Sequence, residues 1–476
     1  MPRSSAPWRE LLCWLALGSL PACVSSSIAD DVRYVRAAAA VERLPAVADR
    51  EVDPVTEREA TRLLAEPLDA EAAVRVALLD NRELRARLRE IGVARGQLMQ
   101  AGLLPNPRAE AELLPERNSR VELRVEYDLT RAVLAPLAAR AGAPELDAAR
   151  TRAAAAVVSL SYRVREGFYR LQAAEQSLAV QQRELDALAA RHEVAQALVA
   201  AGNVAELDVA TEEAAYERAR VMVARRELEV ATERERMQRL LGQHGAATAW
   251  RVRAGLPPVA EAPDVAVDLE RRALTASLAL RERRQRLEAL ARRAGWTRAA
   301  GWIPDVTVDV HGLHGDPDDT AAGPDDDWRF GAGVSLELPL FDRRQGTAAS
   351  LEAEFDALLE TYYGLAVDVR SAARDTRNRV VSAHSRARQY RDVIVPAQRR
   401  VSQQTLLQYN AMQVGIFQLL EARQAELRVE LEEIETLREY WTAVAELGAL
   451  LAGQHVVPAS SESGGMEAPA AGGEEH

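Results

Sequence analysis

The sequence predicts an α+β protein in which very long helices alternate with two pairs of short strands. Two observations predict this fold class. Apolar residues recur at heptad spacing over a long stretch, and four short segments alternate apolar and polar residues with the period of a β-strand. Aromatic residues make up 5% of the chain against 48% hydrophobic residues, which suits close-packed helices better than an aromatic-rich globular core. The net charge of −12 argues against nucleic acid as a partner.

The first 22 residues resemble a bacterial lipoprotein signal peptide. Arg3 and Arg9 precede an apolar run over 11–20 that is too short to span a membrane. The run ends in Leu20-Pro21-Ala22-Cys23, a lipobox-like motif in which Pro21 replaces the usual small residue. We therefore expect residues 1–22 to be removed and Cys23 to carry a covalent lipid. Val24 favours the outer membrane, and residues 23–67 are predicted to be a lipid-anchored extended segment. A signal peptide with an incidental cysteine is the alternative.

Each half of the rest of the chain predicts the same order of elements. A helix (69–104 and 264–300) precedes a strand pair (107–129 and 304–340), a very long helix (141–200 and 346–410) and a shorter helix ending near 242 and 452. Residues 202–210 also match residues 412–420 in their apolar positions. We therefore predict an internal two-fold repeat, with halves at 68–245 and 263–455. A linker at 246–262 joins the halves, and a disordered tail follows at 456–476.

The long helix of the first half has the apolar spacing of a coiled coil. Seven positions at sevenfold spacing form this seam: Val157, Val164, Leu171, Leu178, Leu185, His192 and Val199. His192 is interpreted as a tolerated seam residue. At 1.5 Å per residue, each long helix would measure ~90 Å, more than an ordinary globular core requires.

The strand segments have a different period. Residues 121–129 alternate apolar and charged side chains over about the length of one tilted transmembrane strand. Residues 306–311, 334–340 and 108–113 repeat the pattern. A half-buried soluble sheet would alternate in the same way. Four strands in a membrane would leave free edges, which hydrocarbon does not tolerate, so the chain would have to oligomerise. Three copies would form a twelve-stranded barrel.

The polar side of these strands is predominantly acidic. The acids predicted to face the lumen of such a barrel are Glu110, Glu112, Glu122, Glu126, Asp128, Asp309 and Glu337. Arg108 and Arg124 oppose them, which leaves an excess of five acids in each chain. An acidic lumen predicts a preference for cations.

With these elements in place, the chain resembles the TolC family of outer-membrane factors over residues 68–455. The resemblance rests on the duplicated element order, on Leu104-Pro105-Asn106-Pro107 before the first strand pair and on Leu338-Pro339-Leu340-Phe341 after the second. The stretches 202–210 and 412–420 would be the two hairpin tips. The resemblance implies a homotrimer whose twelve-stranded barrel crosses the outer membrane of a Gram-negative bacterium. A coiled-coil helical barrel would continue it through the periplasm.

The resemblance also implies a function. The protein would be the passive, gated outer-membrane channel of a tripartite efflux system. A periplasmic membrane-fusion adaptor would link it to an inner-membrane pump, with the RND type favoured over the ABC type. Heavy-metal cations and drugs are both compatible substrates. Adaptor contacts map to Gly202, Asn203, Val204, Gln413, Val414 and Gly415, and the periplasmic gate maps to Asp208, Gln418 and Glu421.

The sequence does not predict an enzyme, a metal site or a cofactor. His192-Glu193 begins a zincin-like motif, but Gln196 stands where the second histidine would be needed. The Asp-rich segment 314–328 lacks EF-hand spacing and is interpreted as an exposed loop. The alternative function is a structural lipoprotein whose coiled coils span the periplasm without a pore.

Overall fold

The computed structural model describes residues 28–41, 44, 54–114, 120–245, 249–262, 265–314 and 328–454. The predictions for the signal peptide, Cys23, the Asp-rich loop and the tail therefore lie outside the described residues. The chain divides into two compact units. Among the described residues, the sheet unit contains those within 28–31, 90–150 and 282–361, and the helical unit contains the others.

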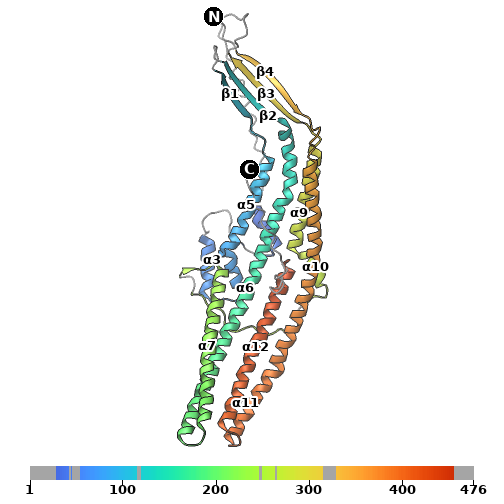
Figure 1. Cartoon of the computed structure of the whole chain (residues 1–476). Helices are drawn as coiled ribbons and strands as arrows, with labels where there is room; N and C mark the ends of the chain where they lie inside the picture. The colour runs from blue at the N-terminus through green and yellow to red at the C-terminus, as the bar shows by residue number, and fades with distance from the viewer. Residues whose placement is uncertain are drawn as a thin grey trace, which may run out of the picture. The chain divides into compact units, whose positions relative to one another are not determined.

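The centre of the sheet unit is a four-stranded antiparallel sheet in the order β1-β2-β3-β4 (Figure 1). Its strands are β1 (Arg108–Leu114), β2 (Arg120–Asp128), β3 (Asp305–His314) and β4 (Arg329–Glu337). All four predicted strands are confirmed. The prediction that the last strand continues to residue 340 was wrong, because β4 ends before Leu338-Pro339-Leu340. Proline has no N–H to donate to a strand ladder, and Leu340 N instead bonds Leu338 O in a tight turn.

Four helices enter or leave one end of this sheet: α5 (Arg82–Gly102), α6 (Leu129–Ala200), α9 (Leu278–Ala300) and α10 (Gln345–Gln389). α6 follows β2 without a loop and begins twelve residues before the predicted start at 141. Thr130 links this start to the next strand pair, because its hydroxyl donates to Pro304 O and accepts from Val306 N. A side chain at Gly301 would clash with the backbone of Arg343, so the chain segments before β3 and after β4 also pack closely.

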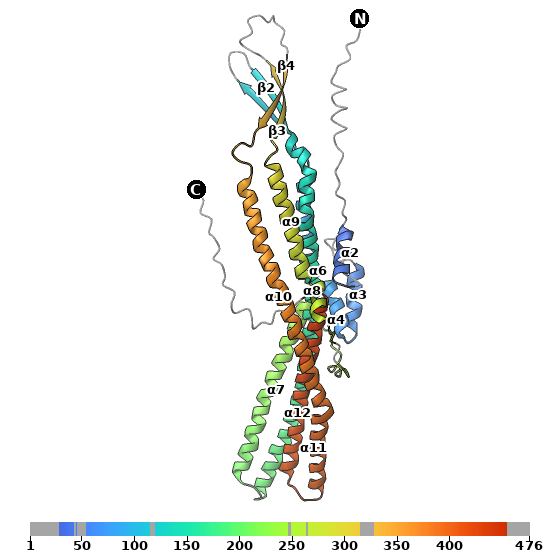
Figure 2. The ribbon, with the colours of Figure 1, turned by 90° about the vertical axis from the view of Figure 1, so that its right-hand side faces the viewer.

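The helical unit contains two long helical hairpins (Figure 2). The first joins α6 to α7 (Glu206–Leu241), and the second joins α11 (Val395–Asn410) to α12 (Ile416–Leu451). The other elements in or entering this unit are α2 (Ile28–Ala38), α3 (Pro54–Ala65), α4 (Ala70–Asp80), α8 (Leu269–Ala276) and the π-helical turn η2 (Tyr390–Ile394). Within the described residues, no helix is both long and apolar enough to cross a membrane.

Four predicted elements differ from the structure. The segment predicted to be extended, 23–67, contains the helices α2 and α3, which bury Val35 and Ala60. The helices predicted at 69–104 and 264–300 are each broken in two, at Asn81 and Ser277. The long helix predicted at 346–410 is interrupted by η2. The π-turn adds a residue to one turn before Pro396, whose missing N–H cannot continue the regular ladder.

The first three positions of the predicted heptad seam lie in the core of the helical unit, and the last four, Leu178, Leu185, His192 and Val199, are only partly buried. Val157, Val164 and Leu171 are fully buried, and the intervening positions Leu160 and Leu188 are also buried. Further along α6, Ala173 and Val180 pack against Leu427 and Ile434 of α12.

Candidate functional site

The strand register places the predicted acidic residues on one face of the sheet. Residues directly opposite each other in an antiparallel pair share a face. One row of such partners runs across the four strands through Arg108, Glu126, Asp309 and Gly333. Alternation along each strand then assigns all seven predicted lumen acids, from Glu110 to Glu337, to this polar face. The register also assigns to this face four residues that the sequence reading missed: Arg120, Asp305, His311 and Arg329. Eight carboxylates therefore share this face with four guanidiniums, and the excess of acids falls from the predicted five to four.

The opposite face of the sheet is apolar and exposed. Leu113, Val125, Val310, Phe330 and Val334 are between 48% and 74% exposed. An uncovered apolar sheet face of this kind normally marks a surface that meets lipid or protein. At the end of the sheet furthest from the helices, the rings of His314, Trp328 and Phe330 stack in series, with centroids 5.1 and 6.2 Å apart.

On the polar face, the side chains of Asp309 and His311 lie against the backbone of β4 at Gly333 and Gly331. The His311 Nδ1 and Asp309 Oδ2 atoms are 2.9 Å apart. A Cβ atom added to Gly331 would lie 2.4 Å from His311 Nε2, and one added to Gly333 would lie 2.3 Å from Asp309 Oδ1. The two glycines of β4 therefore provide the space that the Asp309–His311 pair occupies.

The hairpin tips have closely matching geometry. In the first tip, Gly202 adopts a left-handed conformation (φ 74°), and Asn203 N bonds back to Leu198 O. In the second tip, Met412 takes the equivalent left-handed position (φ 61°), and Gln413 N bonds back to Gln408 O. This is the hydrogen-bond pattern of a helix C-cap, for which glycine is the usual residue. Methionine rarely adopts this conformation, and only the position of Met412, 210 residues after Gly202, indicates it.

The predicted gate residues lie just after these turns. Asp208 accepts a hydrogen bond from Ala205 N at 3.1 Å, and Gln418 accepts one from Gly415 N at 3.3 Å. Each therefore caps the start of its helix, α7 or α12. Glu421 lies exposed one turn further along α12. Within the described part of the chain, the three gate residues are not bonded to one another. Val204 and Val414 are partly buried, whereas the other predicted adaptor residues are exposed.

A polar network joins the two hairpins above their tips. Arg191 of α6 pairs with Glu212 of α7 at 2.6 Å and lies 3.5 Å from the Gln424 amide oxygen of α12. Gln424 in turn donates to Glu184 of α6 at 3.1 Å. The Glu212 side chain is only 8% exposed, so its charge depends on Arg191 for compensation.

The long helices of the helical unit differ between the side that is covered by a chain segment and the side that is not. A strap, residues 249–262, lies along one side and accepts hydrogen bonds from Gln172 of α6, Trp441 of α12 and His384 of α10. Residues two positions apart on a helix differ by about 200° in direction. Arg170 and Arg386, each two positions from one of these contacts, therefore point to the side away from the strap.

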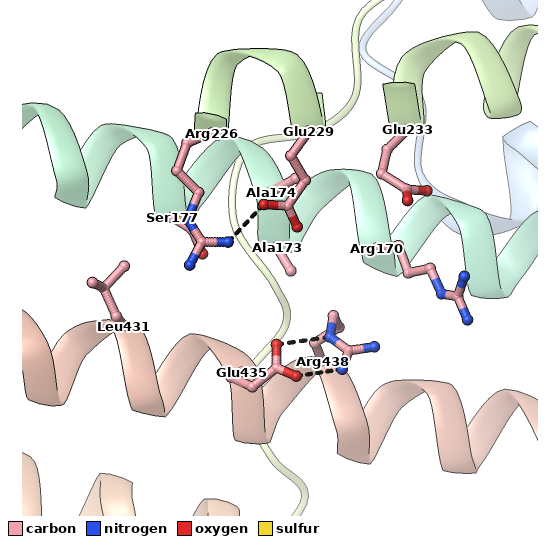
Figure 3. Close-up of a pocket in the computed structure, with 10 residues that line it drawn as sticks. All are labelled: Arg170, Ala173, Ala174, Ser177, Arg226, Glu229, Glu233, Leu431, Glu435 and Arg438. Carbon is pink, nitrogen blue, oxygen red and sulfur yellow. Dashed lines mark hydrogen bonds and ion pairs between the residues drawn. The ribbon is translucent and has the colours of Figure 1, made fainter. Parts of the chain in front are cut away.

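That other side is hollowed and charged. A hollow of about 460 Å³ lies between α6, α7 and α12, and the strap passes behind the helices in this view (Figure 3). Its charged lining residues are Arg170, Arg226, Glu229, Glu233, Glu435 and Arg438. Arg226 bonds Glu229 at 2.6 Å. The hydrogen bond from Arg438 lowers the pKa of Glu435 and keeps it ionised.

A second hollow, of about 470 Å³, lies between α10 and α12. Arg379, Arg386, Glu439 and Glu446 are among its lining residues. Glu446 is almost fully buried, and this burial raises its pKa even though Arg379 and Thr376 both bond its carboxylate. The side of the helices away from the strap is therefore polar over at least four helices.

Several solved outer-membrane proteins have this architecture. The outer-membrane channel OprN matches 88% of this chain and 95% of its own, with a TM-score of 0.66 and 19% identity. VceC, an outer-membrane protein of Vibrio cholerae, matches 81% and 97%, with a TM-score of 0.64 and 17% identity. This chain has the fold of the outer-membrane channels. The predicted resemblance to the TolC family is thereby confirmed in the fold.

CusC, described in connection with transmembrane channel formation, matches 80% of this chain and 91% of its own, with a TM-score of 0.65 and 16% identity. No protein-family profile and no curated protein matches the sequence. Within the residues that the structure describes, no three histidine, cysteine or acidic side chains lie close enough to hold a metal ion.

Proposed function

We propose that this protein is a trimeric outer-membrane channel that conducts solutes passively from the periplasm to the exterior. The observation that carries the proposal is the four-stranded sheet, which has one exposed apolar face, one acidic face and two free edges. The apolar face matches lipid and the acidic face matches water. Free edges in hydrocarbon would leave backbone groups unsatisfied, so three copies closing a twelve-stranded barrel provide the missing partners.

The helical unit would continue the water-filled path. The side with the charged hollows suits a polar solute stream, whereas the strap covers the other side. Arginine and carboxylate side chains both line the hollowed side, and pairs such as Arg226–Glu229 and Glu435–Arg438 form within one helix. A lining of this kind stays hydrated and provides no deep apolar pocket that would retain a solute. We therefore assign the hollowed side to the lumen of a helical barrel.

The hairpin tips are the proposed contact surface for a periplasmic membrane-fusion adaptor. Leu207 and Met412 are 74% and 94% exposed there, beside the predicted contacts at 202–204 and 413–415. Exposed apolar side chains at the end of a polar hairpin suit a protein partner. The gate would lie at the same end, where Asp208, Gln418 and Glu421 of three chains would converge.

Localisation and energy follow from the same proposal. A lipid on Cys23 would anchor the chain in the outer membrane, and an inner-membrane pump, with the RND type favoured, would supply the energy through the adaptor. The acidic strand face favours heavy-metal cations as substrates, and drugs are the second class. The chain is also similar to the outer-membrane channel MtrE of Neisseria gonorrhoeae, whose structure is described as an open state. A channel with an open state supports the proposal of a gate.

Two measurements on the purified mature protein distinguish this proposal from a pore-free periplasmic spacer. The mass of the protein in detergent should correspond to three chains. Its migration on SDS gels should shift after boiling, because a closed barrel resists SDS until it is heated. A monomer or a heat-insensitive coiled coil would instead support the spacer and overturn the channel assignment.

A further inference from the structure

An exposed apolar surface lies where the sheet joins its four helices (Figure 1). Its large apolar side chains are between 38% and 92% exposed and belong to the linkers at 103–104, 302–303 and 338–341 and to Leu129, Val133 and Leu137 of α6. We call this surface the collar. We propose that the collar binds phospholipids of the periplasmic leaflet of the outer membrane, so that the membrane extends below the sheet. This inference rests on the proposed channel and its lipid anchor, and it locates the membrane boundary on the chain.

The collar continues the apolar face of the sheet. Leu338 is next in the alternation of Val334 and Leu336, which are 66% and 57% exposed on that face. Leu129 follows Val125 of the same face in β2 with the same period, and α6 begins there. The apolar surface therefore does not end with the strands. An exposed apolar surface that is continuous with a lipid-facing one suits the same partner.

Basic and aromatic side chains occur together on one linker of the collar. The Arg343 guanidinium carbon lies 4.4 Å from the centroid of the exposed Trp302 ring, and Arg343 Nε donates to Pro339 O at 3.3 Å. Arg344 is exposed, and Asp342 accepts a hydrogen bond from its backbone N–H at 2.7 Å. Within the described part of the chain, neither guanidinium pairs with a carboxylate. Arginine beside an exposed indole suits the membrane–water interface, where guanidiniums meet lipid phosphates.

The N-terminal helix limits how far a lipid on Cys23 can reach. Asp31 of α2 is 3% exposed and bonds Arg95 of α5 and Arg150 of α6, the latter at 2.9 Å. A buried carboxylate with two guanidinium partners is costly to release, so these bonds fix the start of α2 on the two helices. Arg150 lies 21 residues after Leu129, about 31 Å along the axis of α6. Asp31 is therefore held about 31 Å from the end of the sheet.

This distance exceeds the length of chain between Asp31 and Cys23. The five residues from Cys23 to Ile28 span at most about 18 Å, and the helical step to Asp31 adds about 4.5 Å. Even a fully extended chain would leave Cys23 about 9 Å short of the sheet. The thioether and glycerol of the lipid add only a few bonds, so the acyl chains would enter the membrane at the level of the collar. Chain length and surface chemistry thus support the same boundary independently.

Spin labels at three exposed valines test this boundary. Val334→Cys places the label on the apolar sheet face, Val133→Cys on the collar and Val221→Cys on α7, where the native side chains are 66%, 70% and 55% exposed. The mature lipidated protein would have no other free thiol, because Cys13 is removed and Cys23 is acylated. In vesicles of phosphatidylethanolamine and phosphatidylglycerol, oxygen should relax the first two labels several-fold more than a water-soluble nickel chelate does. The label on α7 should show the reverse.

The pattern of accessibility separates the two levels of the proposal. A label at 334 that favours the nickel chelate would overturn the lipid-facing sheet and with it the proposed channel. A label at 334 in lipid and one at 133 in water would overturn only the collar. A label at 133 that neither reagent reaches would show that a second copy covers this surface, which also overturns the collar as a lipid site.

Shortening the chain before α2 gives a second test. Deletion of residues 25–27 removes about 10 Å of reach, so the acyl chains could enter the membrane at the collar only if α2 left its site. In vesicles, hydrogen exchange over 28–38 should rise several-fold in this variant, with lipidation verified by mass. The control is the same deletion with Cys23→Ser, secreted by an ordinary signal peptide, which should exchange like the wild type. Equal exchange in the lipidated variant and the control would contradict the boundary.

The two arginines of the collar are tested by lipid retention. Arg343→Gln combined with Arg344→Gln should reduce the number of phosphatidylglycerol molecules that native mass spectrometry detects on the purified protein by several-fold. Arg281→Gln combined with Arg284→Gln is the matched control, because both side chains are exposed on α9 outside the collar. Equal lipid retention in the two double variants would show that Arg343 and Arg344 do not bind the headgroups.

Discussion

Asp208 and Gln418 occupy equivalent positions in the two hairpin tips, and each accepts a hydrogen bond from a backbone N–H of the preceding turn. Loss of such a cap costs about 1 kcal/mol. We therefore expect Asp208→Ala to increase hydrogen exchange at the amides of 203–208 about fivefold. Asp208→Asn keeps an acceptor oxygen and should exchange like the wild type. An unchanged rate in Asp208→Ala would show that the cap does not hold this turn.

Glu446 predicts a pH dependence of stability. Burial raises its pKa above the ordinary value of 4.5, so the folded protein binds this proton more tightly than the unfolded chain does. The stabilisation is complete below pH 4.5 and is lost as the pH rises through the raised pKa. Glu446→Gln should therefore raise the unfolding midpoint at pH 7 by about 2 °C, with the difference disappearing towards pH 4. Glu439→Gln, at the more exposed Arg386 pair, is the control. A difference independent of pH would contradict this account.

At the scale of elements, Arg191 connects α6 with both α7 and α12. Arg191→Met would leave Glu212 buried without its partner, a change that typically costs about 3 kcal/mol. We expect the two hairpins to separate more readily near their tips and the open probability of the channel to rise. Arg183→Met is the matched control, because Arg183 pairs with Glu430 on the surface with its side chain 48% exposed. Equal effects of both variants on gating would argue against a specific role for Arg191.

Backbone carbonyls of the strap accept hydrogen bonds from side chains in and near the π-helical turn. Arg391 donates to Val259 O at 3.0 Å, and His384 bonds Ala260 O at 2.9 Å. We expect Arg391→Met to make the strap more sensitive to limited proteolysis by several-fold while the helices stay intact. Arg388→Met, which removes a longer bond to Glu261 O of 3.2 Å, should have a smaller effect. Equal protection in all three proteins would show that the strap is held by its apolar contacts alone.

The sequence predicted the elements better than their interruptions. Strand alternation and heptad spacing are local patterns, so all four strands and the long helices could be predicted from them. At the break, Asn81 caps the next helix by accepting from Leu84 N, and its amide also donates to Leu240 O at the end of α7, a distant contact that the sequence does not reveal. The left-handed Met412 could be inferred only from its equivalence to Gly202. Arg120, Asp305, His311 and Arg329 could be assigned to the polar face only once the strand register was known.

For the whole molecule, the acidic strand face leads to a prediction about selectivity. Four excess carboxylates in each chain correspond to twelve in a closed trimer, where all of them would line one barrel. A ring of fixed negative charge raises the local concentration of cations and excludes anions. At the other end of the path, Glu421 of three chains would add carboxylates at the proposed gate. The channel should therefore favour cations, and substitution of Glu421 should change its conductance.

Single-channel recording in planar bilayers would show whether this chain forms a gated channel. The purified mature protein should give small, mostly closed conductances, with reversal potentials in a salt gradient that indicate cation preference. Glu421→Ala should alter the conductance without altering the trimer mass. If a folded, trimeric and membrane-inserted protein conducts no ions in any condition, the channel assignment is wrong.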